Sequence, residues 1–202
     1  MPTTESAPQL ILVTGLPGAG KTSVGRILSE HLRVPCFSKD ACKERIFDGL
    51  GWKDKAWSLK VSAASHRILD DIVEQELKAS RSVIVESNFK AHIDSARFRG
   101  AQRRFGAVAI QVLCWAEGDI LFERYWARQR THRHPGHVEV ATLEEQRRCL
   151  AVGKCEPLHL DGPVIEVDTT DFATVDFSSL AQAITTSMVK SAATRSRGPR
   201  LG

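Results

Sequence analysis

The octapeptide GLPGAGKT occupies residues 15–22 and reads Gly15-Leu16-Pro17-Gly18-Ala19-Gly20-Lys21-Thr22. It matches the pattern G-x-x-x-x-G-K-[ST] at every fixed position. Directly before it, residues 10–13 (LILV) form the unbroken apolar run of a strand that is buried on both faces. After it, apolar residues recur at helical spacing among polar ones, at Val24, Ile27, Leu28 and Leu32. The stretch therefore predicts a buried strand, a glycine-rich loop and a helix N-terminus in that order.

That arrangement is a cradle for phosphate groups. Glycines let backbone N–H groups turn inward onto phosphate oxygens, and the helix dipole favours negative charge at this point. We expect Lys21 to reach the β- and γ-phosphates of a nucleotide and the Thr22 hydroxyl to be a ligand of Mg²⁺. Ser23 follows directly, and we count it with residues 15–22 as nucleotide-binding. A glycine-rich turn that binds nothing is the alternative, and it would not require strand, lysine, threonine and helix together.

Length, composition and charge narrow the class of protein. A chain of 202 residues allows one α/β domain or at most two small ones. No apolar run approaches the roughly 20 residues that span a bilayer, and the first residues lack the features of a signal peptide. Five cysteines without a C-x-x-C pair indicate free thiols and predict a cytoplasmic protein. The net charge of +4 is mild, and arginines gather in 97–104 and 124–133, which favours local anion binding over a general nucleic-acid surface.

Apolar segments that alternate with helical patterns predict an α/β sheet. The expected strands lie at residues 10–13, 35–38, 82–86, 107–114 and 164–167. Such alternation implies a mostly parallel sheet with helices on both faces. We expect one domain over residues 9–189, with disordered tails at 1–8 and 190–202. Ligands of such sheets bind beyond the carboxyl ends of the strands, so the residues that follow each strand are the candidate site.

Polar residues follow the second and third predicted strands. Transfer of a γ-phosphoryl group to an alcohol needs a carboxylate that deprotonates the acceptor hydroxyl. Asp40 is the candidate base, with Lys43 one helical turn later as a substrate contact; N-capping of a helix is an equally good and compatible interpretation of Asp40. Glu86 and Asn88 are candidates to meet Mg²⁺-bound water or acceptor hydroxyls. A polar strand end capped by Asn88 is their alternative interpretation.

A basic segment before Pro135-Gly136 is the candidate lid. Arg124 and Arg128 lie one helical turn apart, and the presence of a P-loop favours a lid at about 124–140 over a solvated basic helix. Histidines at positions 132, 134 and 137 lack Cys or acidic partners at metal-ligand spacing, so contact with substrate or phosphate, by Arg133 and His134, is preferred over a metal site. We expect the acceptor site to draw on residues 40–57, 86–93 and 133–140.

Five short stretches together carry a resemblance: residues 15–22, Ser38-Lys39-Asp40, Glu86-Ser87-Asn88-Phe89, Arg133-His134-Pro135-Gly136-His137 and Val167-Asp168-Thr169-Thr170. The chain resembles the small P-loop kinases of the zeta-toxin, chloramphenicol phosphotransferase and polynucleotide kinase group, which are often classed with AAA-like ATPases. The resemblance spans about residues 9–189. It implies an adenylate-kinase-like, three-layer α/β/α fold with a five-stranded parallel sheet in the order 2-3-1-4-5, a helical lid, and ATP with Mg²⁺ as donor.

The same resemblance implies roles for individual residues. Asp40 would be the base, Arg124 would lie near adenine, and Arg128 would contact the transferring phosphates, which makes Lys21, Asp40 and Arg128 the catalytic set. Two departures stand out. Polynucleotide kinases have an arginine where this chain has Lys43, and the third strand ends in Glu86 instead of a Walker B aspartate, so the second Mg²⁺ contact is undefined.

The leading hypothesis is an ATP-dependent kinase that phosphorylates a hydroxyl of a small molecule such as a nucleoside, sugar or antibiotic. A 5′-hydroxyl polynucleotide kinase is one alternative and requires a continuous basic groove that leads to Asp40. A non-catalytic nucleotide switch is another and would not depend on Asp40. A toxin-type kinase of a nucleotide sugar is a third and would be paired with an inhibitory partner. The chain has no room for the sensor regions of AAA+ motors.

Overall fold

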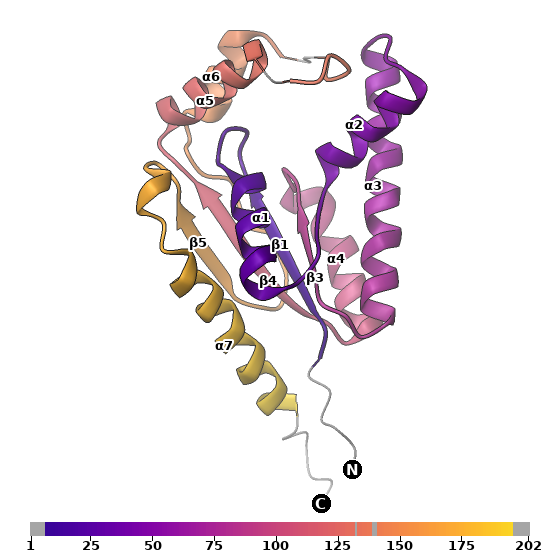
Figure 1. Cartoon of the computed structure of the whole chain (residues 1–202), viewed down its shortest axis with the longest axis vertical. Coiled ribbons are helices and arrows are strands. Elements are labelled where there is room, and N and C mark those ends of the chain that lie inside the picture. Colours follow the sequence, from indigo (N-terminus) through magenta and orange to yellow (C-terminus); the bar gives the residue numbers. More distant parts are fainter. Residues whose placement is uncertain (1–6, 132, 139–140, 196–202) are drawn as a thin grey trace, which may run out of the picture.

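Five parallel strands form the centre of the molecule (Figure 1). The computed structural model describes residues 7–131, 133–138 and 141–195. The strands are β1 (Gln9–Gly15), β2 (Cys36–Ser38), β3 (Val83–Glu86), β4 (Val108–Trp115) and β5 (Val164–Asp168). They pair in the order β2-β3-β1-β4-β5, and every pair is parallel. The predicted sheet and its strand order are confirmed.

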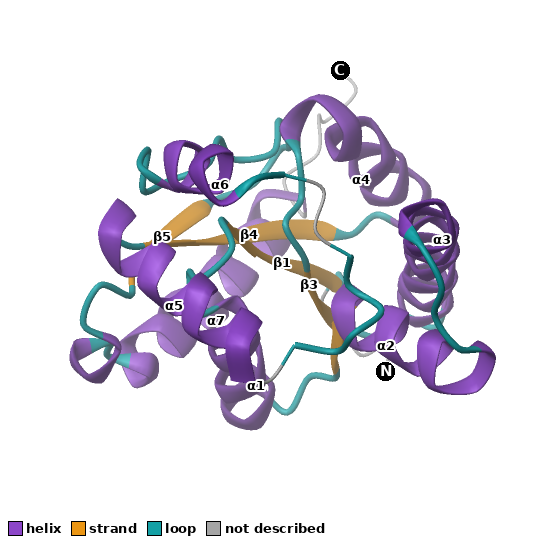
Figure 2. Ribbon diagram, turned by 90° about the horizontal axis from the view of Figure 1, so that it is seen from above, coloured by secondary structure: helices purple, strands orange, loops and turns teal. Residues whose placement is uncertain are grey.

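Helices cover both faces of the sheet and its carboxyl edge. They are α1 (Lys21–Leu32), α2 (Lys39–Leu50), α3 (Lys55–Lys78), α4 (Ala91–Phe105), α5 (Gly118–Thr131), α6 (Leu143–Leu150) and α7 (Phe177–Arg195). Helices α1 and α7 lie on one face and α3 and α4 on the other (Figure 2). Helices α2, α5 and α6 lie beyond the carboxyl ends of the strands (Figure 1). The fold is therefore a three-layer α/β/α sandwich with further helices above its carboxyl edge.

Strand β1 is the middle strand and every one of its residues is buried. Successive side chains on a strand point to opposite faces, so Leu10 and Leu12 join the apolar cluster under α3 and α4. Ile11 and Val13 join the cluster under α1 and α7. Full burial of such a side chain stabilises the fold by about 1.5–3 kcal/mol. The unbroken apolar run before the glycine loop is thus the consequence of two cores that share one strand.

The helices that begin at the carboxyl edge differ in how they are capped. The Ser38 hydroxyl accepts from the Ala41 N–H and begins α2, and Asp54 accepts from the Trp57 N–H, at 2.8 Å, and begins α3. Thr142 and Glu145 form the predicted capping box of α6. Helix α1 has glycine at its N-cap and no side-chain cap, so its first N–H groups are left for another acceptor.

The ends of the described chain differ from the predicted boundaries. Helix α7 continues to Arg195, six residues past position 189. Residues 190–195 contain no glycine or proline, and Gly198 and Pro199 are the first strong helix breakers after them. At the other end, Pro8 is buried and its carbonyl oxygen accepts from the Val108 N–H at 2.9 Å. None of the described helices combines the length and the apolar character that a membrane crossing requires.

Candidate active site

The glycine-rich loop joins β1 to α1 at the centre of the carboxyl edge. Gly18 and Gly20 adopt φ angles of 87° and 69°, a region that L side chains rarely occupy. A Cβ atom at Gly18 would lie 2.5 Å from the carbonyl oxygen of Leu121, so the loop also approaches α5 too closely for a side chain. Within the turn, the Ala19 N–H donates to the Leu16 carbonyl at 3.1 Å. The uncapped first turn of α1 lines the cavity above this loop, which is the anion cradle that the sequence predicts.

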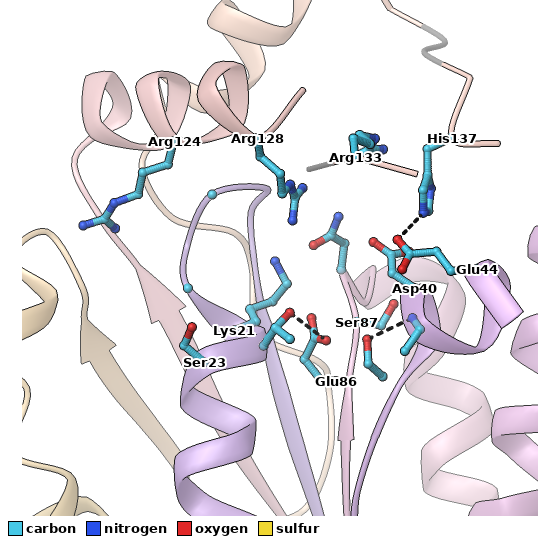
Figure 3. Close-up of a pocket in the computed structure, with 16 residues that line it drawn as sticks. Lys21, Ser23, Asp40, Glu44, Glu86, Ser87, Arg124, Arg128, Arg133 and His137 are labelled. Atoms are coloured by element: carbon cyan, nitrogen blue, oxygen red, sulfur yellow. Dashed lines mark hydrogen bonds and ion pairs between the residues drawn. The ribbon is translucent and has the colours of Figure 1, made fainter. Parts of the chain in front are cut away.

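One cavity of about 410 Å³ gathers most of the predicted site residues (Figure 3). It is lined by the glycine loop, the starts of α1 and α2, the end of β3, helix α5 and the loop after it. The predicted residues among its lining are Gly18, Gly20, Lys21, Thr22, Ser23, Asp40, Glu86, Asn88, Arg124, Arg128 and Arg133. Gly15, Leu16, Pro17 and Ala19 do not line it; they shape the loop beneath.

Lys21 lies inside the loop. Its side chain is buried, and Nζ donates to the Leu16 carbonyl at 2.9 Å. Burial lowers the pKa of Lys21, and the nearby carboxylate of Glu86 opposes that shift. A buried ammonium group at the mouth of an anion cradle gains most from a phosphate oxygen, because the phosphate replaces the water it has lost.

Thr22 and Glu86 meet at the base of the cavity. The Thr22 hydroxyl donates to Glu86 Oε2 at 3.2 Å. Hydroxyl and carboxylate oxygens are the ligands that Mg²⁺ prefers, and this ion is usually held by one or two protein ligands, water and substrate phosphates. Among the described residues, no group of three or more His, Cys, Asp or Glu side chains is placed to hold a metal ion by itself. This donor set fits a nucleotide-bound Mg²⁺ and suggests Glu86 for the contact that the missing Walker B aspartate leaves open.

Asp40 lies in the first turn of α2 and its side chain is 46% exposed. Ser38, not Asp40, is the N-cap of α2, so the capping interpretation of Asp40 is wrong and its carboxylate is left to face the cavity. Lys39 Nζ lies 3.2 Å from Asp40 Oδ1. Burial pushes the pKa of Asp40 upward, but Lys39, His137 and Arg133 outweigh it, so the pKa lies below its usual value. At neutral pH the carboxylate is ionised and able to accept a proton.

The two predicted lid arginines both belong to α5 but point in different directions. Arg128 points down into the cavity, toward Lys21, whereas Arg124 points away from that group (Figure 3). Arg124 Nη2 donates to the Thr170 carbonyl at 2.9 Å, in the loop after β5. Its Nη1 is buried and has no hydrogen-bond partner within the described part of the chain. Arg128 therefore shares the space above the P-loop, and Arg124 connects α5 to the β5 loop.

A second cavity of about 360 Å³ adjoins the first. The two cavities share Asp40, Asn88, Arg128, Arg133 and His137. Lys43 lines only the second cavity: its Nζ donates to Ser58 Oγ at 2.9 Å, and that hydroxyl donates to the Gly136 carbonyl at 2.9 Å.

His134 is not placed as the sequence predicts. It lines neither of these cavities. Its ring stacks on Phe47 at 5.4 Å, meets Trp52 edge-on at 5.2 Å, and places Nε2 3.3 Å from Asp48. Because aromatic and carboxylate groups of α2 and the following turn hold this ring, His134 anchors the loop 133–138, and the geometry does not support substrate contact. Position 132 lies outside the described residues, as do 139 and 140 of the expected lid.

Two lining residues, His137 and Glu44, fall within the predicted acceptor ranges 133–140 and 40–57 but are not among the individually predicted site residues. His137 Nε2 lies 2.9 Å from Glu44 Oε1, and both residues line the first cavity (Figure 3). Burial, followed by the charge of Arg133, lowers the pKa of His137; in its contact with the Glu44 carboxylate, which can only accept, the ring N–H donates. Glu44 follows Asp40 by four residues and hence lies on the same helix face, which is a signal that the sequence contains. Nothing local to His137 distinguishes it from its neighbours.

Fold and site together define a P-loop nucleotide-binding protein. A family model described as an AAA domain matches residues 10–152, which is more than half of the chain, and the chain belongs to that family. A search of curated proteins finds no match.

Solved structures share this fold. A candidate kinase from Chloroflexus aurantiacus J-10-fl is 38% identical, with a TM-score of 0.84 over 89% of this chain and 98% of its own. The APS kinase of Mycobacterium tuberculosis, in complex with AMPPNP and APS, is 16% identical with a TM-score of 0.58, over 90% of this chain and 98% of its own. A gluconokinase from Sinorhizobium meliloti 1021 is 13% identical with a TM-score of 0.52, over 97% and 99%. At such identities the last two show the fold alone.

Proposed function

We propose that this protein is an ATP-dependent kinase that transfers the γ-phosphoryl group of ATP to a hydroxyl of a small molecule. One observation carries the proposal: the ionised carboxylate of Asp40 faces the same cavity as the P-loop Lys21 and the inward-pointing Arg128. A pure nucleotide switch needs the cradle but has no use for a carboxylate beside it. The similarity to the Chloroflexus candidate kinase supports the same conclusion.

Each residue has a role that follows from its position. Lys21 and Arg128 stabilise the negative charge of the transferring phosphoryl group. When Mg²⁺ is bound, Thr22 would hold it and Glu86 would accept a hydrogen bond from a water of the ion. Asp40 takes the proton of the acceptor hydroxyl. The acceptor oxygen bonds to the γ-phosphorus, and the bond between that phosphorus and the oxygen that bridges to the β-phosphate breaks, which leaves ADP. ATP with Mg²⁺ supplies the phosphoryl group and the leaving ADP. Arg124, held on the β5 loop, borders the adenine side.

The proposal also specifies a kinase family and a lid. The zeta-toxin, chloramphenicol phosphotransferase and polynucleotide kinase group remains our assignment, with α5 and the following loop as the lid. Within that group a small acceptor is favoured, because residues 133–138 dock onto α2 through His134 and form one wall of the cavities. We propose the cytoplasm, where ATP is available, as the location.

A transfer screen with an Asp40→Asn variant tests the proposal. Purified protein, Mg²⁺ and ATP are incubated with nucleosides, sugars, sugar acids, aminoglycosides, nucleotide sugars and 5′-hydroxyl oligonucleotides, and products are identified by mass. We expect one acceptor class to gain a phosphoryl group. Asp40→Asn should lower kcat by about 10²–10⁴-fold, the usual contribution of general base catalysis, and leave ATP affinity within about tenfold.

Asp71→Asn is the matched control, since Asp71 is exposed on α3 and lines neither cavity. It should keep wild-type transfer. Transfer that persists in Asp40→Asn would remove Asp40 from its role as base. Tight ATP binding without transfer to any acceptor would favour the nucleotide switch.

A further inference from the structure

The cavity beside the P-loop cavity is lined by an unusual set of charges. Among the described residues, those that line it but not the P-loop cavity include four lysines, Lys39, Lys43, Lys55 and Lys90, and no acidic residue. Asp40, shared by both cavities, is the single carboxylate among the described residues that line it. The lining therefore carries a clear excess of positive charge.

These lysines come from three separate parts of the chain. Lys39 and Lys43 belong to α2, Lys55 begins α3, and Lys90 precedes α4. Lys43 is buried and donates to Ser58, while Lys55 and Lys90 are exposed at the rim. Like charges brought together from different elements repel one another, and a bound anion relieves that repulsion. Lys39 already contacts Asp40 Oδ1 at 3.2 Å and Lys43 donates to Ser58, so Lys55 and Lys90 at the rim are the cations best placed to meet a further anion.

Resting on the proposed kinase function, we infer that the acceptor is a small molecule that carries an anionic group, a carboxylate or a phosphate, in addition to the hydroxyl that is phosphorylated. The anionic group lies among Lys39, Lys55 and Lys90. The hydroxyl lies at Asp40, where the two cavities meet. The charge in the second cavity thereby orients the acceptor so that its hydroxyl faces the P-loop cavity.

The dimensions of the cavity fit a small acceptor. A volume of about 360 Å³ lies at the lower end of the range of about 300–1,000 Å³ for small-molecule sites. Leu59, Tyr125 and Val138 add apolar surface beside Ser58 and Ser62, which suits a compact molecule with both apolar and hydroxyl-bearing parts. A polymer would need a groove that continues beyond this cavity.

Matched acceptor pairs test the inference by phosphoryl transfer. Aldoses are compared with their aldonic acids, polyols with their monophosphates, and nucleosides with their monophosphates, and 5′-hydroxyl oligonucleotides are included. We expect kcat/KM to be at least about tenfold higher for the anionic member of the productive pair. Lys55→Gln and Lys90→Gln should each raise the acceptor KM severalfold. Lys60→Gln, an exposed lysine of α3 outside both cavities, should match wild type.

A binding measurement that needs no reaction separates the inference from the kinase proposal. Inorganic phosphate is titrated calorimetrically into protein saturated with AMPPNP and Mg²⁺, so that the P-loop is filled. We expect binding that the Lys55→Gln/Lys90→Gln double variant weakens at least about fivefold, and that Lys60→Gln preserves.

The outcomes are distinct. Transfer that favours the neutral member of each pair, or that occurs only with oligonucleotides, overturns the anionic small-molecule acceptor and leaves the kinase activity standing. If no acceptor is phosphorylated, the kinase proposal fails, and the phosphate titration tests the anion site. Phosphate binding that depends on Lys55 and Lys90 supports the anion site, and the absence of such binding overturns it.

Discussion

Arg124 and Arg128 lie one helical turn apart on α5, yet their side chains meet different partners. Arg124 is held by the Thr170 carbonyl, with one buried nitrogen unpaired among the described residues, while Arg128 points toward Lys21 (Figure 3). In the proposed mechanism, Arg124 borders the nucleotide and Arg128 the transferring group. Interactions made only in the transition state affect kcat, whereas those made equally in the ground state affect KM.

Substitution of each arginine by methionine separates these roles. Arg128→Met should lower kcat by at least about 10²-fold, since charge stabilisation at the transferring group is lost, with a small change in the KM for ATP. Arg124→Met should raise the KM for ATP by about tenfold and lower kcat much less. Steady-state kinetics with ATP varied at saturating acceptor measures both. Equal effects of the two variants on kcat would contradict the assignment.

Glu86 occupies the position at which the sequence lacks a Walker B aspartate, and the Thr22 hydroxyl donates to it. If Glu86 orients Mg²⁺-bound water, its neutral amide should bind the ion less well. Glu86→Gln is expected to raise the Mg²⁺ concentration for half-maximal transfer by about tenfold, with nucleotide affinity in EDTA unchanged. Glu123→Gln, an exposed residue of α5 outside both cavities, is the control. An unchanged Mg²⁺ dependence in Glu86→Gln would remove Glu86 from the metal site.

At the scale of elements, the loop 133–138 is attached to α2 and α3 by several contacts. His134 stacks on Phe47, the His137 ring contacts Glu44, and Ser58 of α3 donates to the Gly136 carbonyl. Gly136 packs against the fully buried Phe47 ring so closely that a Cβ atom would overlap it. The glycine is thus required for the close approach of the loop to α2.

Gly136→Ala should push the loop away from Phe47. We expect a loss of about 1–3 kcal/mol in unfolding free energy, the usual cost of overpacking, and a severalfold increase in the acceptor KM. Denaturant titration and steady-state kinetics measure the two effects. Gly49→Ala in α2 is the control, since a Cβ there meets nothing within 4 Å, and it should not destabilise the protein. Wild-type stability and KM in Gly136→Ala would show that the loop does not depend on this contact.

For the whole molecule, partly buried histidines link folding to pH. Burial, and then the charges of Lys39 and Arg97, lower the pKa of His66 on α3, and its Nδ1 has no hydrogen-bond partner among the described residues. The pKa of His137 is lowered as well, first by burial and then by Arg133. Below the ordinary histidine pKa of 6.5 the unfolded chain takes up protons that the folded chain resists, so the folded state loses stability as pH falls.

Urea unfolding between pH 7 and pH 5 checks this linkage. Wild type should become less stable toward pH 5, and His66→Gln should make the decline shallower, by at most about 1.4 kcal/mol per pH unit for one proton. His137 would account for part of the remaining slope. His31→Gln, an exposed position on α1, should keep the wild-type slope. Parallel curves for His66→Gln and wild type would show that His66 does not contribute.

The sequence by itself determined the features that depend on neighbouring residues. A strand, a glycine loop and a lysine-threonine helix start are one continuous stretch, and alternating apolar segments specify an α/β sheet, because periodicity and backbone preference act over a few residues. The candidate base could be found in the same way, since Asp40 comes two residues after a strand.

Only the tertiary structure decided which residues share a surface. Ser38 and Asp40 are both residue types that cap helices well. In the structure Ser38 is the N-cap of α2, and the Asp40 side chain lines the cavity. The His134 ring stacks on Phe47, which lies 87 positions earlier in the chain, and this contact holds the loop 133–138 on α2. Lys43, Lys55 and Lys90 converge on one cavity from separate elements. Such placements depend on how whole elements pack, and no local pattern encodes the distance between side chains that are far apart in the chain.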